Sequence, residues 1–406
     1  MEEKVFYDIH CHAMNLSHPN LSALLRRVNI PLVLAVYTPA ISIFMRDKIE
    51  KTTNTLSIME SDMGSFFLLM EHCLKKDNPL WISDKGHRGL RVGEKIYGKI
   101  ILTPLMMDFG YKNMRITEEY CKNIVEKPIV EQVIDVFWGI KKYINESSEK
   151  LFEIYPFLGI NTKNYTMKKI NIMLDKYFGD YDGTYGKLRE NYQKLSGFSG
   201  NIGELGSNCF SGIKLYPPLG FDPWPGDGPE REKVKYLYEY CMNKGIPVTV
   251  HCSDGGFIVG DPQESERRTS PDAWEEVLIK YPDLKINFGH MGKLGKLKKM
   301  LNRQEWAQKI IDYILRYDNV YTDFSNCGFS EEYYKSLRKL IGSYSEKQQK
   351  KINDRILFGS DYMVNLLYCD SYSSYIRVFS ESGSLNEVEK SKFSSANPEK
   401  FLFTRK

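Results

Sequence analysis

Short apolar segments recur at a nearly constant interval through the C-terminal half of the chain, and this spacing restricts the fold more than any other feature. The segments end at Tyr216, Cys252, His290, Ser325 and Asp361. One segment therefore ends roughly every 36 residues, about the length of a strand followed by a helix. The segments are rich in β-branched residues, and the stretches between them have helical patterns. Such apolar strands are typical of a parallel sheet that is buried on both faces.

The N-terminal half adds three strand-like segments at wider intervals, residues 4–10, 97–109 and 150–161. Together with the segments downstream they fit either a closed (β/α)8 barrel or a doubly wound sheet. Both architectures are α/β folds, so the sequence predicts an α/β protein.

No clean linker interrupts the chain, so we expect residues 1–406 to form a single domain. The intervals around residues 13–96 and 162–208 are longer than one crossover helix, and we expect insertions of extra helices or loops there. Within the second interval, residues 179–208 are rich in Gly, Tyr and Ser, which predicts a long loop with a short helix.

Composition and charge exclude several classes of protein. A formal net charge of +4 over 406 residues is too small to indicate binding to nucleic acid or to an anionic membrane. The longest apolar run, Ile30–Met45, is shorter than the ~20 residues of a spanning helix, so we expect no membrane partner. The N-terminal residues lack a signal-peptide pattern, and the eight cysteines contain no CxxC pair. We therefore expect reduced thiols in a cytoplasmic protein.

Side chains that can bind metal fall near the ends of the predicted strands. His10 and His12 are two residues apart on the first strand, so both imidazoles face the same side. The carboxyl ends of barrel strands form one mouth, where a third imidazole and a carboxylate would complete a divalent-metal site. The later strands end in His251, His290 and Asp361, which can supply these groups.

A metal ion at this mouth predicts hydrolytic chemistry, because a bound ion lowers the pKa of water from about 15.7 toward about 7. These five candidate ligands are one more than the four that a zinc ion usually takes. His290 is then either a general acid or base, or it joins Lys214 in holding a second ion. A protonated Lys214 repels a metal, so this side chain would bind one only after modification, for instance as a carbamate.

Six segments of the chain resemble the amidohydrolase superfamily of metal-dependent TIM-barrel hydrolases; they read YDIHCH, GIKLYPP, PVTVHC, LKINFGHMG, NVYTDFS and ILFGSDY. Within that superfamily they are similar to the amidohydrolase-2 branch, which includes the aminocarboxymuconate-semialdehyde decarboxylase-like enzymes. The resemblance covers the first strand and nearly everything from Phe198 to Asp361. It implies a distorted TIM (β/α)8 barrel with helical and loop insertions, mainly in the N-terminal half.

The resemblance also implies roles for single residues. His10 and His12 correspond to the two strand-one metal ligands, and His251 corresponds to the strand-five ligand. Asp361 corresponds to the strand-eight carboxylate, which in this family binds metal and moves a proton. His290 corresponds to the strand-six histidine, which holds a second metal in binuclear members and is catalytic or orienting in mononuclear ones.

Lys214, in the segment KLYP, leaves the number of metal ions open. It resembles the carboxylated lysine that bridges two metals in dihydroorotase-like members, whereas relatives in the nearer branch have a similar KLHP lysine for which bridging is not implied. We expect one or two divalent ions. Histidine-rich ligation favours zinc, with manganese and iron as alternatives.

Loops after the predicted strands carry side chains that could contact a substrate. Tyr216, Trp224 and Arg231 follow the fourth strand, and Arg267 and Arg268 follow the fifth. The aromatic side chains would form an apolar wall, and the arginines could hold a carboxylate. We expect a small-molecule substrate, and a homo-oligomer is left open.

The function predicted from these residues is that of a metal-dependent hydrolase acting on a C–N or C–O bond of an amide, lactone or ester. Asp361, helped by His290, would move the protons. The first alternative is a metal-dependent nonoxidative decarboxylase, which releases CO2 without net consumption of water. A PHP-type phosphoesterase also begins with DxHxH, but the FGSD segment counts against it. A non-catalytic scaffold is disfavoured by the complete set of ligands.

Overall fold

The computed structural model describes residues 4–19, 46–76, 78–84, 87–110, 128–293 and 300–403. Within them the protein is an α/β structure whose central strands are parallel. The apolar run Ile30–Met45 lies outside the described residues.

Two parallel sheets form the centre of the fold. One has three strands in the order β1-β5-β6, and the other has six in the order β12-β11-β10-β9-β8-β7. Their bounds are β1 (Val5–Cys11), β5 (Lys99–Pro104), β6 (Phe152–Ile154), β7 (Phe157–Gly159), β8 (Gly212–Leu215), β9 (Val248–Val250), β10 (Ile286–Phe288), β11 (Val320–Asp323) and β12 (Ile356–Leu357). Each predicted strand segment contains one of these strands, and residues 150–161 contain two. Every residue of β8, β9, β10 and β11 is buried, as their apolar sequences predict.

Backbone hydrogen bonds also connect the two sheets to each other. The amide of Ile9 on β1 donates to the carbonyl of Phe358, just after β12, over 3.2 Å. At the other junction the amide of Met106, just after β5, donates to the carbonyl of Phe157 on β7 over 3.1 Å. The carboxyl ends of β1 and β12 are therefore held side by side.

Helices connect successive strands of the six-stranded sheet. Their bounds are α9 (Pro229–Lys244), α10 (Pro262–Thr269), α11 (Glu275–Lys280), α12 (Met300–Arg316), α13 (Glu331–Gly342) and α14 (Glu346–Asn353). The sequence fixes both ends of α9. Pro229 occupies the first helical turn, where its missing N–H costs nothing, and Gly245 ends the helix in the left-handed conformation with φ 65°.

The described part of the first insertion holds two helices and a small antiparallel sheet. These are α4 (Arg46–Glu60), α5 (Met63–Lys75), β2 (Trp81–Asp84), β3 (His87–Val92) and β4 (Lys95–Tyr97). The expected helices are present, and the small sheet is an addition that the sequence did not predict. Gly93 begins the two-residue turn between β3 and β4 and has a φ of 57°, a conformation that favours glycine. Because these strands are short and contain polar residues, no clear apolar alternation marks them.

Three more helices lie between β5 and β8: α6 (Ile129–Glu146), α7 (Met167–Phe178) and α8 (Tyr185–Lys194). Residues 179–208 contain α8, as the predicted short helix, together with loops and two short 3-10 helices, Leu195–Gly197 and Ile202–Glu204. After β12 the chain forms α15 (Tyr372–Glu381), α16 (Glu387–Ser391) and α17 (Asn397–Leu402). Among the described residues no helix has the length and apolar character to cross a bilayer.

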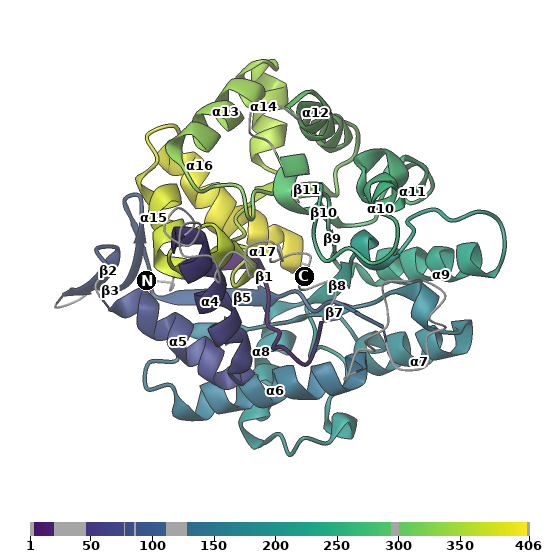
Figure 1. The fold of residues 1–406 in the computed structure, drawn as a ribbon, viewed down its shortest axis with the longest axis horizontal. Coiled ribbons are helices and arrows are strands. Elements are labelled where there is room, and N and C mark those ends of the chain that lie inside the picture. The colour runs from purple at the N-terminus through teal and green to yellow at the C-terminus, as the bar shows by residue number, and fades with distance from the viewer. Residues whose placement is uncertain are drawn as a thin grey trace.

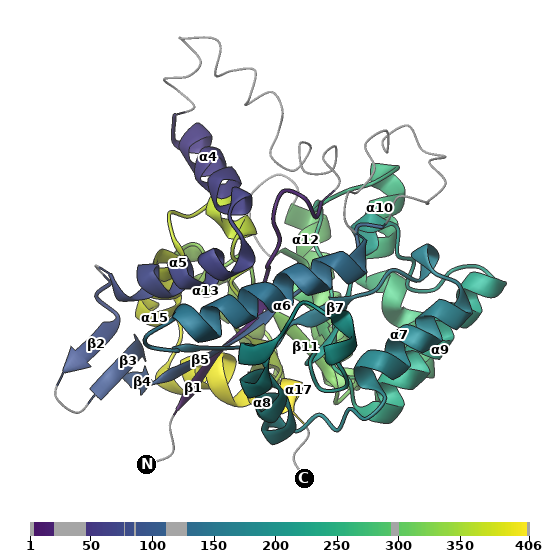
Figure 2. The same ribbon diagram turned by 90° about the horizontal axis from the view of Figure 1, so that it is seen from below.

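The helices lie around the outside of the parallel strands. Figure 1 shows α12, α13 and α14 on one side of the strands and α5, α6 and α7 on the opposite side. Figure 2 shows β2, β3 and β4 together at one end of the molecule, far from α7 and α9. The carboxyl ends of the parallel strands are thereby left to carry the polar side chains described next.

Candidate metal centre

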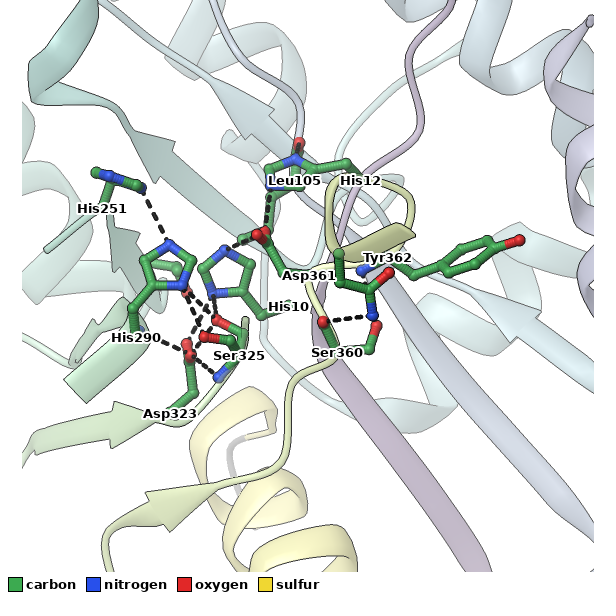
Figure 3. A network of polar contacts seen from close by, with 12 residues as sticks. His10, His12, Leu105, His251, His290, Asp323, Ser325, Ser360, Asp361 and Tyr362 are labelled. Carbon is green, nitrogen blue, oxygen red and sulfur yellow. Dashed lines mark hydrogen bonds and ion pairs between the residues drawn. The ribbon is translucent and has the colours of Figure 1, made fainter. Parts of the chain in front are cut away.

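Three of the predicted metal-binding side chains meet at the carboxyl ends of β1, β10 and β12. One ligand atom each from His10, His290 and Asp361 lies within 4.8 Å of the other two. The Nε2 atom of His12 is 3.0 Å from Oδ1 of Asp361, and Nε2 of His10 is 3.5 Å from the same oxygen. All four side chains are buried. Figure 3 shows them pointing toward one another, with His251 beside His290.

Where these side chains meet, three residues just past the strands have left-handed backbone. His290, Asn326 and Asp361 have φ values of 67°, 54° and 60°, although none is a glycine. Such backbone costs on the order of 1–3 kcal/mol per residue and persists where the surroundings enforce it. For Asp361, the enforcing contact is a hydrogen bond from its own amide to the carbonyl of His10, 2.6 Å long.

The hydrogen bonds of His12 determine which of its ring nitrogens carries the proton. Its Nδ1 lies 2.9 Å from the carbonyl oxygen of Leu105. A carbonyl can only accept, so Nδ1 must donate, and the neutral ring then presents a lone pair at Nε2. That lone pair faces the Asp361 carboxylate oxygen at 3.0 Å. Two acceptors this close require a proton or a cation between them.

His10 is arranged in the same way. Its Nδ1 lies 2.8 Å from Oδ2 of Asp323, while its buried Nε2 has no hydrogen-bond partner among the described residues. Burial lowers the pKa of His10 below its ordinary value, although the charge of Asp323 opposes this shift. The ring is therefore neutral, with an unshared lone pair directed toward Asp361.

His290 and His251 extend the cluster to β9 and β10. The Nδ1 atom of His290 lies 2.9 Å from the carbonyl of Ser325, and its Nε2 lies 3.1 Å from Nδ1 of His251. On the far side of His251, Nε2 is 3.2 Å from the hydroxyl of Ser253. Burial lowers the pKa of His290 to about 3. His290 is therefore a neutral base at physiological pH.

Asp361 is ionised despite its burial. Burial by itself raises the pKa of its carboxyl, but the close contacts with His12, His290 and His10 outweigh this effect and hold the pKa below its usual range. A buried anion faced by three imidazole nitrogens is a donor set that suits a divalent cation such as zinc.

Lys214, on β8, is fully buried, and its Nζ has no hydrogen-bond partner in the described part of the chain. Burial lowers the pKa of this amine to about 8, although Asp323 and Asp361 act in the opposite direction. Its Nζ lies 5.6 Å from the centre of the Tyr216 ring. The geometry brings the amine to the edge of the cluster.

The clustered side chains border a small pocket. His12, His251, His290 and Asp361 line it together with Tyr216 and with Ser253, Asp254, Gly256, Phe257, Asn326 and Val364. Its free volume is about 20 Å³, which is enough for one water molecule or one ion.

Of the five predicted substrate contacts, Tyr216 is the one that lines this pocket. Its ring centre is 4.7 Å from that of His251, and its hydroxyl accepts a hydrogen bond from the amide of Phe257 over 3.0 Å. Arg231 instead stacks on Trp224 at 4.2 Å.

Arg267 and Arg268 both contact carboxylates on their own side of the fold. Arg267 is 3.3 Å from Asp222 and 3.1 Å from Glu264. Arg268 is 3.7 Å and 3.5 Å from the same two residues. In the described part of the chain, neither arginine borders the pocket, and their roles toward a substrate stay predictions.

Sequence reasoning missed Asp323 and Ser325. The segment NVYTDFS contains both, but no role was assigned to either. Asp323 is fully buried at the end of β11. A signal was present, because a carboxylate at the carboxyl end of a barrel strand lies at the same mouth as the histidines.

The protein therefore carries imidazole and carboxylate groups together at the carboxyl ends of parallel α/β strands, an arrangement typical of metal-dependent enzymes. Residues 203–404 match the family model described as amidohydrolase. Over this C-terminal half the chain belongs to the amidohydrolase family, which confirms the resemblance seen in its motifs. No curated protein gives a significant match to the sequence.

Solved structures are similar to this chain over nearly its whole length, at low identity. The 5-carboxyvanillate decarboxylase from Novosphingobium aromaticivorans, solved with manganese and 4-hydroxy-3-methoxy-5-nitrobenzoic acid, is 13% identical with a TM-score of 0.46; 98% of this chain and 96% of that chain are covered. A probable 2-pyrone-4,6-dicarboxylic acid hydrolase from Acinetobacter baumannii, with citric acid bound, is 11% identical with a TM-score of 0.48, and 98% of each chain is covered. The 4-oxalomesaconate hydratase from Rhodopseudomonas palustris is 13% identical with a TM-score of 0.48, covering 98% of this chain and 95% of that chain.

Proposed function

We propose that this protein is a divalent-metal-dependent hydrolase that cleaves a C–N or C–O bond of an amide, lactone or ester. The observation that carries the proposal is the contact between His12 and Asp361. Two hydrogen-bond acceptors, Nε2 of His12 and Oδ1 of Asp361, face each other at 3.0 Å in a buried site. The unpartnered Nε2 of His10 lies 3.5 Å from the same oxygen. A cation satisfies all three groups at once.

His10, His12, His251 and Asp361 would hold this ion. Zinc is our first choice, because imidazole nitrogen suits it and its usual coordination accommodates three imidazoles with one carboxylate. His290 would either join this shell or act beside it. A second ion would require Lys214 as a carbamate, and the lowered pKa of this amine, about 8, leaves more of it in the neutral form that reacts with CO2.

When bound, the ion supplies Lewis acidity, lowering the pKa of a water molecule and polarising an oxygen of the substrate. Asp361 is ionised and buried, so its carboxylate can take the proton of the attacking water and return it to the leaving group. The neutral His290 can accept a proton at Nε2, which faces the pocket beside His251. Tyr216 borders the path of the substrate to these groups.

Beyond the metal centre, a small-molecule substrate would contact the loops that follow β8 and β9. We propose Trp224 and Arg231 as an apolar and cationic wall, because their stacked side chains form one surface. Arg267 and Arg268 would bind a substrate carboxylate in exchange for their present contacts with Asp222 and Glu264.

We also infer that the two parallel sheets form one closed, distorted (β/α)8 barrel, in a single domain. The hydrogen bonds from Ile9 to Phe358 and from Met106 to Phe157 support closure at both junctions. One apolar core that includes Phe6, Val248 and Phe393 supports a single domain. The cysteines among the described residues are all free thiols, which supports a reducing, cytoplasmic location.

The proposal is tested by elemental analysis of the purified protein, followed by a screen of amides, lactones and esters with zinc or manganese. Reaction in H2(18)O should place the isotope in the carboxylate product. Release of CO2 from an aromatic or unsaturated acid, without uptake of the isotope, would instead establish a decarboxylase. Protein that binds no divalent ion would contradict both enzymes.

A further inference from the structure

We propose that Asp323 is a positioning residue that fixes the tautomer of His10, so that Nε2 of this imidazole faces the metal centre as a bare lone pair. This inference rests on the proposed metal centre and assigns a function to a residue that the chemistry itself does not touch. Asp323 lies at the end of β11, behind His10 as seen from Asp361 (Figure 3).

Five donors surround the Asp323 carboxylate. Oδ1 receives the amides of His290 and Ser325, each at 3.0 Å, and the hydroxyl of Ser325 at 2.5 Å. Oδ2 receives Nδ2 of Asn287 at 2.7 Å and Nδ1 of His10 at 2.8 Å. The backbone amides of His290 and Ser325 and the NH2 group of Asn287 can only donate, so both oxygens of Asp323 serve as acceptors, as in an ionised carboxylate. An ionised carboxylate only accepts, so each of these contacts has one direction.

The direction of these contacts decides where the proton of His10 lies. Because Oδ2 of Asp323 accepts, Nδ1 of His10 must donate, and the lone pair of the neutral ring is at Nε2. Ser325 reinforces this choice. Its hydroxyl proton is given to Asp323, so its oxygen can only accept at the two further contacts it makes, with Nδ1 of His10 at 3.0 Å and Nδ1 of His290 at 2.9 Å.

The ring proton of His290, unlike that of His10, is held by a backbone carbonyl. Its Nδ1 also lies 2.9 Å from the backbone carbonyl of Ser325, which accepts whatever residue 323 is. The tautomer of His290 is therefore fixed without Asp323. His290 provides an internal control within the same molecule.

The informative variant is Asp323→Asn. Two of the three donors at Oδ1 are backbone amides that cannot reverse, so the amide oxygen of the new side chain should occupy that position. Its NH2 group then faces Nδ1 of His10 and forces the ring proton to Nε2. Asn287 can accommodate the change by rotating its amide, because its own Oδ1 has no partner in the described structure.

The experiment compares the full-length protein with Asp323→Asn, using zinc alone as the ligand. Zinc affinity is measured by competition with a chromophoric chelator, and histidine tautomers of the metal-free proteins are read from long-range 15N–1H couplings in 15N-histidine samples. We expect zinc binding to weaken by about 10- to 100-fold. We also expect the His10 signal to change from the Nδ1–H to the Nε2–H form, while the His290 signal stays unchanged.

An Nε2–H tautomer for His10 in the wild-type protein would overturn the inference without any variant. Zinc binding by Asp323→Asn as tight as in wild type would also overturn it. If the variant does not fold, the wild-type spectrum still decides. If the wild-type protein binds no divalent ion, the proposed function fails, whereas the tautomer of His10 is read separately.

Discussion

Nε2 of His12 and Oδ1 of Asp361 lie 3.0 Å apart, although the proton on Nδ1 of His12 is committed to the carbonyl of Leu105 on the opposite side of the ring. The two residues come from the first and the last parallel strands, which backbone hydrogen bonds hold side by side. Burial prevents water from screening two acceptors placed so close together. The contact is therefore best satisfied by a cation, and most of the predictions below depend on it.

Asp361→Asn should reduce kcat by about 100- to 10,000-fold, because the amide cannot accept the proton of the attacking water. The kcat of both proteins is measured by steady-state kinetics at full zinc occupancy, with a substrate found in the screen. Asp318→Asn is the matched control, since the Asp318 side chain is 84% exposed and distant from the cluster. Full activity in Asp361→Asn would remove Asp361 from the mechanism.

His12→Ala should weaken zinc binding by more than about 100-fold, because losing a direct ligand costs at least as much as losing a supporting residue. The fold should persist, since the strand hydrogen bonds of β1 are made by backbone. Chelator competition and far-ultraviolet circular dichroism measure the two effects. His72→Ala, on the exposed face of α5, should bind zinc normally. Equal affinity in His12→Ala and wild type would exclude His12 as a ligand.

Gly359→Ala should disturb the metal centre by steric contact alone. A Cβ atom at residue 359 would lie 2.6 Å from Cβ of His10 and 3.1 Å from Cβ of Ser325. We expect a loss of about 1–3 kcal/mol of stability, together with weaker zinc binding. Gly342→Ala is the control, because a Cβ atom at residue 342 would have no neighbour within 4 Å among the described residues. Urea unfolding of both variants makes the comparison, and an unchanged Gly359→Ala would show that His10 can move freely.

Asp108 should make stability depend on pH. Burial raises the pKa of its carboxyl from 3.8 to about 6, with hydrogen bonds from Asn161 and other neighbours opposing the shift. The folded state then binds more protons than the unfolded state between these values, so stability falls as the pH rises from 4 to 6. The free energy of unfolding should fall by roughly 3 kcal/mol over this pH range.

In Asp108→Asn the new side chain is neutral at every pH, so this pH-dependent contribution to the free energy of unfolding is absent. The free energy of unfolding of the variant, minus that of wild type, should therefore increase by about 3 kcal/mol between pH 4 and pH 7. Denaturant titrations at several pH values measure the difference. A difference that does not change with pH would show that Asp108 ionises normally in the folded protein.

Much of the fold and most of the side chains that gather at the candidate site were accessible from the amino-acid sequence. The recurring apolar segments predicted the parallel strands, because strands buried on both faces must be apolar along their length. The alternation of His10 and His12 predicted a shared face, since side chains two residues apart on a strand point the same way. The small sheet of β2, β3 and β4 was not predictable in this way, because its short strands contain polar residues and glycine.

Tertiary structure alone decided which groups are acceptors and which are donors. A histidine in a sequence has two possible tautomers, and only the carbonyl of Leu105 and the carboxylate of Asp323 determine which nitrogen of His12 and His10 faces the centre. The sequence by itself thus indicated the parallel strands and the histidines and carboxylate that lie at their ends. The packing of those strands determined where each proton lies, because hydrogen-bond direction depends on neighbours that are remote along the chain.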